Sequence, residues 1–272
     1  MRIRPAPLLL LLLIVACAAP AAEQAGIILA TTTSAYETGL LDTLIDQFTA
    51  TTGIEVKPIA VGSGAALMMA ERGDADATLT HDPAAEARYV AAGHLVEGRR
   101  LMHNDFLLVG PPVDPAGVAG TADAVEAMRR VAARGPFVSR GDGSGTESQE
   151  LALWQEAGVV VDSVRGRVET GQGMSATLYV ANDRQAYTLV DRATWLTLRS
   201  RVELVPLSEG DPRLRNDYSV HLVNPALHLG TRAVPARKFL EFMVSPAVQQ
   251  MIAEFGRERL GGRLFIPETP GE

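Results

Sequence analysis

The feature that most constrains the fold is a repeated alternation of short apolar segments with amphipathic ones. Residues 27–30 are apolar, which is typical of a buried strand, and residues 38–52 place apolar side chains on one helical face before Gly53. The unit recurs with strands at 55–61 and 77–80 and helices at 65–72 and 83–92. This alternation predicts an α/β fold in which helices cover a parallel sheet.

A second series follows the first. The strand at 106–110 precedes a stretch rich in proline and glycine at 111–120, which interrupts the alternation. After it we expect helices at 122–133, 146–157, 174–181, 235–243 and 246–255, and strands at 137–139, 186–190 and 218–223. We therefore predict two lobes, each a sheet flanked by helices. Lobe I comprises residues 23–105 and 217–272, and lobe II comprises residues 106–216.

The N-terminus has the layout of a secretory signal: Arg2 and Arg4 precede an apolar run at 8–15 that is too short to span a bilayer. The run ends in Ile14-Val15-Ala16-Cys17, which resembles the bacterial lipobox, where cleavage precedes the cysteine. We expect residues 1–22 to be signal and linker, with Cys17 as the lipid anchor. The alternative is cleavage at 19–22 without an anchor. Cys17 is the only cysteine, which excludes an internal disulfide.

The net charge limits the partners. The whole chain carries −7, and removal of residues 1–16 changes this to −9 for the remaining 256 residues. Nucleic-acid binding depends on clustered basic residues, so we expect no nucleic-acid partner. Capture of a small anion depends on local donors, because distant charges are screened over roughly 8 Å at physiological salt. The acidic balance therefore leaves an anion receptor open.

Four expected strand-to-helix loops contain short hydroxyl residues, glycine or both. The loop at 31–36 has three threonines and a serine, the loops at 61–65 and 139–147 have both residue types, and the loop at 171–174 has two glycines. In open α/β sheets the ligand crevice lies beyond the carboxyl ends of the strands, where helix N-termini present unpaired N–H groups that accept anions. Arg140 adds a planar fork suited to two oxygens of an oxyanion. A single Ser or Thr in such a loop is alternatively a helix cap. The four loops together favour an oxyanion site.

Enzymatic motifs are missing from the sequence. The only lysines, Lys57 and Lys238, belong to no phosphate-binding loop, and Ser144 does not lie in a G-x-S-x-G elbow. The five histidines show no metal-ligand spacing. We therefore expect a protein that is not an enzyme and has no cofactor. A secreted hydrolase with Ser144 as its nucleophile is the remaining enzymatic alternative. His81 follows a strand and either lines the cleft or caps the next helix at the surface.

The chain resembles the tungstate-binding receptors of Tup-type ABC transporters, a branch of the two-lobed periplasmic binding proteins. The matching segments are Ala30-Thr31-Thr32-Thr33-Ser34, Gly73-Asp74-Ala75-Asp76, Asn104-Asp105-Phe106, Ser139-Arg140-Gly141-Asp142, Ser144-Gly145-Thr146, Gly171-Gln172-Gly173-Met174 and Tyr187-Thr188-Leu189-Val190-Asp191-Arg192. The resemblance implies an extracytoplasmic receptor that captures tungstate, or molybdate, for an ABC permease and its ATPase, with the ligand cleft between the two lobes. It also implies a periplasmic or cell-surface location. We expect a monomer.

The resemblance also implies which residues hold the oxyanion. They share the glycine- and hydroxyl-bearing loops and are Thr32, Thr33, Ser34, Ser63, Arg140, Ser144, Gly145 and Thr146. A second set of candidates on or beside the same loops comprises Gly64, His81, Asp142, Gly173 and Met174. Gly143 and Glu147 depart from the family pattern, which has Asp and His there.

The loop at 140–146 is also similar to that of phosphate-binding receptors, so a phosphate receptor is the main alternative. Protonated phosphate is best recognised by a site with an acceptor carboxylate, whereas tungstate is a bare dianion that needs only donors. The orientation of Asp142 therefore separates the two ligands. A carboxylate facing the ligand favours phosphate, and one held by Arg140 favours tungstate.

Overall fold

The computed structural model describes residues 26–268. Its strands are β1 (Ile27–Thr32), β2 (Val56–Val61), β3 (Ala77–Thr80), β4 (Leu95–Gly110), β5 (Val138–Ser139), β6 (Val168–Glu169), β7 (Thr188–Asp191), β8 (Val205–Ser208), β9 (Arg215–Val223) and β10 (Ile266–Pro267). Its α-helices are α1 (Thr33–Glu37), α2 (Leu40–Thr52), α3 (Ser63–Arg72), α4 (Pro83–Ala91), α5 (Ala124–Arg134), α6 (Gly145–Glu156), α7 (Met174–Asp183), α8 (Arg192–Leu198), α9 (Ala233–Met243), α10 (Pro246–Glu254) and α11 (Arg257–Leu260). The expected signal segment and Cys17 lie outside the described residues.

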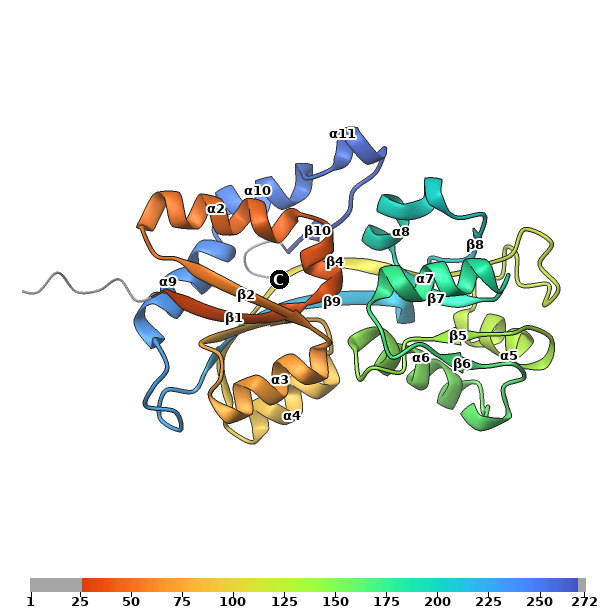
Figure 1. Cartoon of the computed structure of the whole chain (residues 1–272), viewed down its shortest axis with the longest axis horizontal. Coiled ribbons are helices and arrows are strands. Elements are labelled where there is room, and N and C mark those ends of the chain that lie inside the picture. Colours follow the sequence, from red (N-terminus) through yellow and green to blue (C-terminus); the bar gives the residue numbers. More distant parts are fainter. Residues whose placement is uncertain (1–25, 269–272) are drawn as a thin grey trace, which may run out of the picture.

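The chain forms two halves joined by the long strands β4 and β9, which run side by side between them (Figure 1). We call the half with β1, β2 and β3 lobe I and the half with β5, β6 and β7 lobe II. The main sheet has the order β10-β4-β9-β3-β1-β2. The first part of β4 pairs with β9 and β10, and its last residues pair with β7 and β8. One strand therefore belongs to the sheets of both lobes.

The main sheet is mixed, so the prediction of a parallel sheet holds there only for β1, β2 and β3. The separate pair of β5 and β6 is also parallel. Strand β9 lies antiparallel to both β3 and β4. The reason is topological: β9 returns from lobe II and runs back along lobe I, so no right-handed helical crossover precedes it. The prediction also missed the first part of β4, where the polar segment Glu97–Arg100 interrupts the apolar pattern.

Each lobe buries its own apolar side chains. In lobe I, α2, α9 and α10 pack around Phe48, Phe239 and their neighbours, and α3 packs on the other face of the sheet. In lobe II, Trp154 and Phe137 form an edge-to-face pair in a core that α5 and α6 cover. Helix α8 contacts both cores, because Ala193 packs into that of lobe I whereas other residues of the helix pack into lobe II. Within residues 26–268, every helix is too short or too polar to span a bilayer.

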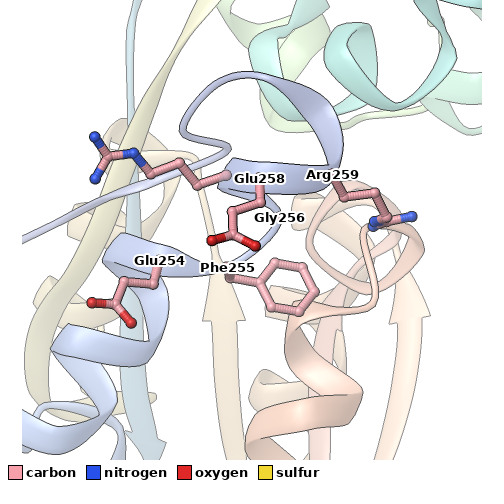
Figure 2. A pocket seen from close by; sticks show the side chains of 6 residues that line it. Glu254, Phe255, Gly256, Glu258 and Arg259 are labelled. Atoms are coloured by element: carbon pink, nitrogen blue, oxygen red, sulfur yellow. The ribbon is translucent and has the colours of Figure 1, made fainter.

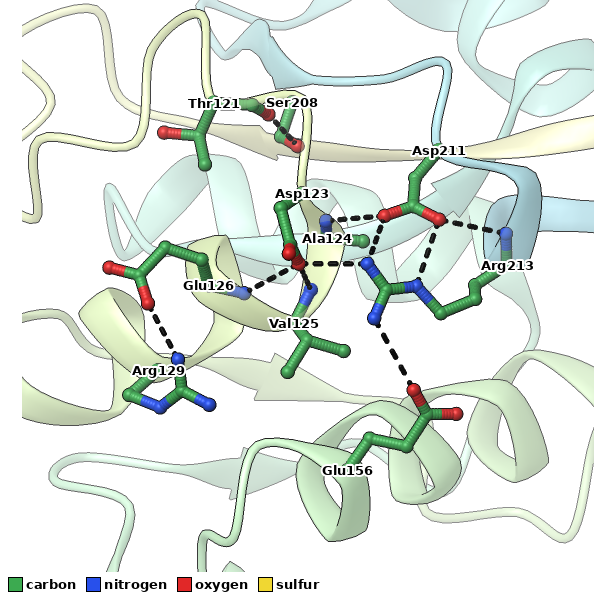
Figure 3. Close-up of polar contacts among 10 residues, drawn as sticks. All are labelled: Thr121, Asp123, Ala124, Val125, Glu126, Arg129, Glu156, Ser208, Asp211 and Arg213. Carbon is green, nitrogen blue, oxygen red and sulfur yellow. Dashed lines mark hydrogen bonds and ion pairs between the residues drawn. The ribbon is translucent and has the colours of Figure 1, made fainter.

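A cluster of charged side chains fastens the start of α5 to the segment that precedes β9 (Figure 3). The buried carboxylate of Asp211 accepts hydrogen bonds from the backbone N–H of Ala124 at 2.8 Å and from the guanidinium of Arg213 at 2.5 and 2.9 Å. Arg213 also pairs with Asp123, which caps α5. The Arg213 guanidinium holds the pKa of Asp211 far below its usual value.

Replacing Asp211 by asparagine is expected to lower the free energy of unfolding at pH 7 by about 1–3 kcal/mol, because a charged hydrogen-bond acceptor is lost from a buried cluster. The folded-state pKa is depressed, so this stabilisation is present above the ordinary aspartate value of 3.8 and is lost as the pH falls below it. Urea unfolding at pH 7 and under acid conditions measures the difference. Asp46→Asn, at an exposed position on α2, is the matched control. An equal effect at both pH values would contradict the assignment.

Candidate oxyanion-binding site

The loops predicted to carry the site meet where the two lobes touch. Thr32 at the end of β1 pairs in register with Val61 at the end of β2, so two of the loops are neighbours in lobe I. Across the interface, the backbone N–H of Gly64 donates to the carbonyl oxygen of Gly143 at 3.1 Å. The loop at 61–65 therefore contacts the loop at 139–147 directly, and the N–H of Gly64 is engaged by lobe II.

A second contact between the lobes joins the loop at 171–174 to the loop at 31–36. A Cβ atom placed on Gly173 would lie 3.5 Å from Oγ1 of Thr33, so the loop before α7 faces the loop before α1. Ser175 donates to the carboxylate of Glu37 at 2.5 Å in the same region. All four predicted loops are thus brought to one place, two from each lobe.

Arg140 is buried at the centre of these loops, with 2% of its side chain exposed. Its Nε donates to the carbonyl oxygen of Gln172 at 2.7 Å, and its Nη2 donates to Oδ2 of Asp142 at 2.5 Å. Nη1 is buried without a hydrogen-bond partner among the described residues. The edge of the guanidinium that contains Nε is therefore occupied, and only the end with Nη1 remains for an oxyanion.

Hydroxyl groups from both lobes share this lack of partners. The buried side-chain oxygens without a hydrogen bond among residues 26–268 include Thr31 Oγ1, Thr33 Oγ1, Ser34 Oγ and Thr146 Oγ1. A buried polar group without a partner costs roughly 1–3 kcal/mol, so folded proteins rarely leave several in one place. These four oxygens and Nη1 of Arg140 belong to or adjoin loops that meet at the lobe interface, and they form a set of donors that a ligand could satisfy.

Ser63 is completely buried at the start of α3, and its Oγ accepts a hydrogen bond from the backbone N–H of His81 at 3.4 Å. The hydroxyl proton remains available as a donor. Thr32 and Ser144 also use their oxygens as acceptors, capping α1 and α6 through the N–H groups of Ala35 and Glu147. The helix-cap interpretation is therefore correct for the oxygens of Thr32 and Ser144. Capping uses only the oxygen as an acceptor, so the hydroxyl proton of each residue can still be donated to a ligand.

Backbone N–H groups add further donors. Helices α3 and α7 begin after Gly62 and Gly173, which supply no side-chain cap, so their first N–H groups have no intrahelical partner. Gly145 and Thr146 are the first two residues of α6. The Met174 side chain is buried in the apolar core of lobe II, so only its backbone faces the loops. These termini carry partial positive charge suited to an anion.

The carboxylates on the third loop are already used. Oδ2 of Asp142 accepts from Arg140, and Oδ1 accepts from the backbone N–H of Ser144 at 3.2 Å. Glu147 accepts from the backbone N–H of Gly143 at 2.6 Å, so the two residues that depart from the family pattern bond to each other. The loop thus presents donors rather than an unoccupied carboxylate.

His81 lies beneath this site with 3% of its surface exposed, so the alternative of a surface histidine is wrong. Asp82 is the residue that caps α4. The ring stacks on Tyr218 with centroids 4.8 Å apart, and Nδ1 lies 2.9 Å from Oδ1 of Asn216. Burial lowers the pKa of His81, which favours a neutral imidazole.

A surface hollow of about 810 Å³ lies elsewhere, against the end of α10 and against α11 (Figure 2). Glu254 and Glu258 contribute carboxylates to its wall beside Arg257 and Arg259. The two carboxylates offset the two guanidinium groups, so this hollow offers a dianion no net positive charge. The loops around Arg140 remain the candidate site.

Three residues that form or support the site were not predicted as site residues from the sequence. Thr31 was recognised only as part of its motif, although its oxygen is buried without a partner. Gln172 acts through its carbonyl oxygen, so its side chain carried no signal. Asn216 is separated from His81 by 135 positions, and no local pattern links the two.

Comparison with known proteins identifies the family. Residues 18–247 match the PBP superfamily domain. The tungstate-binding protein TupA of Peptoclostridium acidaminophilum is 42% identical over 241 residues, which cover 88% of this chain and 84% of that protein. The chain belongs to the PBP superfamily and, within it, to the TupA family. The resemblance and the two-lobed fold predicted from the motifs are confirmed.

Solved structures place this TupA-family chain in the same fold. The tungstate-binding protein TupA from Desulfovibrio alaskensis G20 superposes with a TM-score of 0.76 at 42% identity, covering 90% of this chain and 99% of that one. The tungstate ABC transporter structure from Geobacter sulfurreducens gives a TM-score of 0.76 at 38% identity, covering 84% and 98%. A putative ABC transporter anion-binding protein of Haloferax volcanii is 41% identical over 247 residues, which cover 89% of this chain and 71% of that protein.

Proposed function

We propose that this protein captures tungstate, with molybdate as the next ligand, outside the cytoplasmic membrane and delivers it to an ABC importer. The observation that carries the proposal is the group of unpartnered buried donors on facing loops: Nη1 of Arg140 and Oγ1 of Thr146 in lobe II, and the hydroxyls of Thr33 and Ser34 in lobe I. A tetrahedral dianion accepts hydrogen bonds in several directions at once. It would therefore satisfy donors from both lobes and hold them together.

The remaining predicted residues have roles in the same proposal. Ser63 would donate its hydroxyl proton, and Thr32 and Ser144 would do so while capping their helices. Gly145 would contribute its backbone N–H at the start of α6. A hydrogen bond to a charged group contributes roughly 1.5–3 kcal/mol, so five or six donors give tight binding after the cost of ordering.

The phosphate alternative is disfavoured by Asp142. Phosphate near neutral pH carries a proton, and its recognition benefits from a carboxylate that accepts that proton. Both oxygens of Asp142 are engaged, by Arg140 and by the backbone of Ser144, and Glu147 is engaged by Gly143. A ligand without protons matches these donors better.

Titration calorimetry with tungstate, molybdate, phosphate and sulfate tests the proposal. We expect tungstate and molybdate to bind with dissociation constants below about 1 µM, and phosphate at least about a hundredfold more weakly, because a protonated oxygen finds no acceptor. Sulfate shares the dianion's charge and is the control for size. Clear phosphate binding without heat from tungstate would overturn the proposal in favour of a phosphate receptor.

We infer no catalytic role. The hydrolase alternative requires a base on Ser144, and within residues 26–268 the oxygen of Ser144 contacts the backbone N–H of Glu147 rather than a histidine. The further parts of the proposal are lobe boundaries at 23–105 plus 217–272 and 106–216, a monomer, a permease with its ATPase as partner, and a lipid anchor at Cys17 that keeps the receptor at the membrane.

A further inference from the structure

We propose that His81 is a positioning residue for oxyanion capture, held by a relay of buried side chains that crosses both connecting strands from Asp191 in lobe II. This inference rests on the proposed function. It adds the set of contacts that orients Ser63, one of the proposed hydrogen-bond donors to the oxyanion. Asn104 and Asn216, which are register partners on β4 and β9, form the middle of the relay. None of these four side chains is expected to touch the ligand.

The relay is continuous and fully buried. Asn104 Nδ2 lies 3.4 Å from Oδ1 of Asp191, and Asn216 Nδ2 donates to Oδ1 of Asn104 at 2.8 Å. Asn216 Oδ1 lies 2.9 Å from Nδ1 of His81. Each of the four residues has less than a tenth of its surface exposed. The chain of contacts therefore runs from the end of β7 to the loop after β3.

The direction of the relay fixes the tautomer of His81. Asp191 is an acceptor, as shown by the N–H and hydroxyl that Thr194 donates to it at 2.9 and 2.6 Å. Asn104 must then donate to Asp191 and accept from Asn216, which leaves Oδ1 of Asn216 as an acceptor for His81. A neutral imidazole has one donor nitrogen, so the proton lies on Nδ1.

The backbone of His81 contacts residues on both sides of the ligand site, so the position of His81 affects both. Its N–H donates to Oγ of Ser63 at 3.4 Å, so the oxygen of that serine faces His81 and its hydroxyl proton is left for another acceptor. Its carbonyl oxygen lies 2.4 Å from where a Cβ of Gly145 would be. Holding the ring on Asn216 and Tyr218 therefore fixes the position of Ser63 and the surface against which α6 rests.

Substitutions at His81 that mimic one ring nitrogen at a time test the inference, using the full-length mature chain and tungstate calorimetry. Asparagine places its amide near Nδ1 and keeps the bond to Asn216, whereas glutamine places its amide near Nε2 and does not. We expect His81→Gln and His81→Ala to weaken tungstate binding about tenfold, and His81→Asn to stay within about threefold of the wild type. Equal affinities of the Asn and Gln variants would overturn the inference.

A double-mutant cycle with Ser63→Ala separates positioning from general damage. Because one of the two routes from His81 runs through Ser63, His81→Gln should have a clearly smaller effect in the Ser63→Ala background than in the wild type, whereas fully additive losses would overturn the inference. The wild-type protein tests the proposed function itself. If the wild type binds tungstate and the losses are additive, only the role of the relay is rejected. If the wild type does not bind tungstate, both the proposed function and the relay are rejected. Thermal unfolding of each variant checks that the fold is intact.

Discussion

Replacing Arg140 by alanine is expected to weaken tungstate binding by at least about 2 kcal/mol, roughly thirtyfold, while the protein stays folded. Arg140 supplies the only full positive charge among the predicted ligand-binding side chains, and it is 2% exposed. Charge-assisted hydrogen bonds in such a buried position are among the strongest that a protein makes. Titration calorimetry of the purified variant with tungstate measures the loss directly.

The variant also frees Asp142, which adds repulsion of the dianion to the loss of a donor. The double variant Arg140→Ala, Asp142→Ala removes that repulsion and is expected to recover part of the affinity. Arg237→Ala, which removes an arginine paired with Glu97 on the exposed surface of lobe I, is the control for a change of one charge far from the loops. Wild-type affinity in a folded Arg140→Ala protein would mean that Arg140 only supports the loop.

Much of the site could be predicted because its parts are local. A strand followed by glycine and a short hydroxyl residue specifies both the turn and the helix N-terminus, and the loops at 61–65 and 139–147 carry that pattern. The expected boundaries of β3 and the expected start of α7 agree with the structure for the same reason. Local signals suffice where a segment forms its own structure.

The parts that could not be predicted depend on contacts between distant positions. The sequence suggested that the guanidinium of Arg140 offers two nitrogens to an oxyanion. In the structure its Nε donates instead to the carbonyl oxygen of Gln172, 32 positions away. Helix α8 follows Asp191 and packs on both cores, which no single amphipathic face indicates. The pairing of Asn104 with Asn216 depends on the register of β9, which is set in the assembled sheet.

Replacing Gly145 by alanine is expected to reduce tungstate affinity at least about a hundredfold by keeping the lobes apart. Gly145 begins α6, where alanine suits the helix, so lobe II should fold normally. The added Cβ would lie 2.4 Å from the backbone oxygen of His81 in lobe I, and a backbone atom cannot move aside as a side-chain tip can. The donors of one lobe would then lie too far from an anion held by the other.

Calorimetry and small-angle X-ray scattering together identify this cause. Tungstate is expected to decrease the radius of gyration of the wild type and to leave that of Gly145→Ala unchanged. Gly230→Ala is the matched control, because a Cβ there meets no atom within 4 Å and the residue requires no left-handed backbone. If Gly145→Ala binds tungstate within about threefold of the wild-type affinity, the two lobes bind the anion without the close approach of α6 to His81. Each hydrogen bond lost to a charged group should lower the affinity by more than threefold.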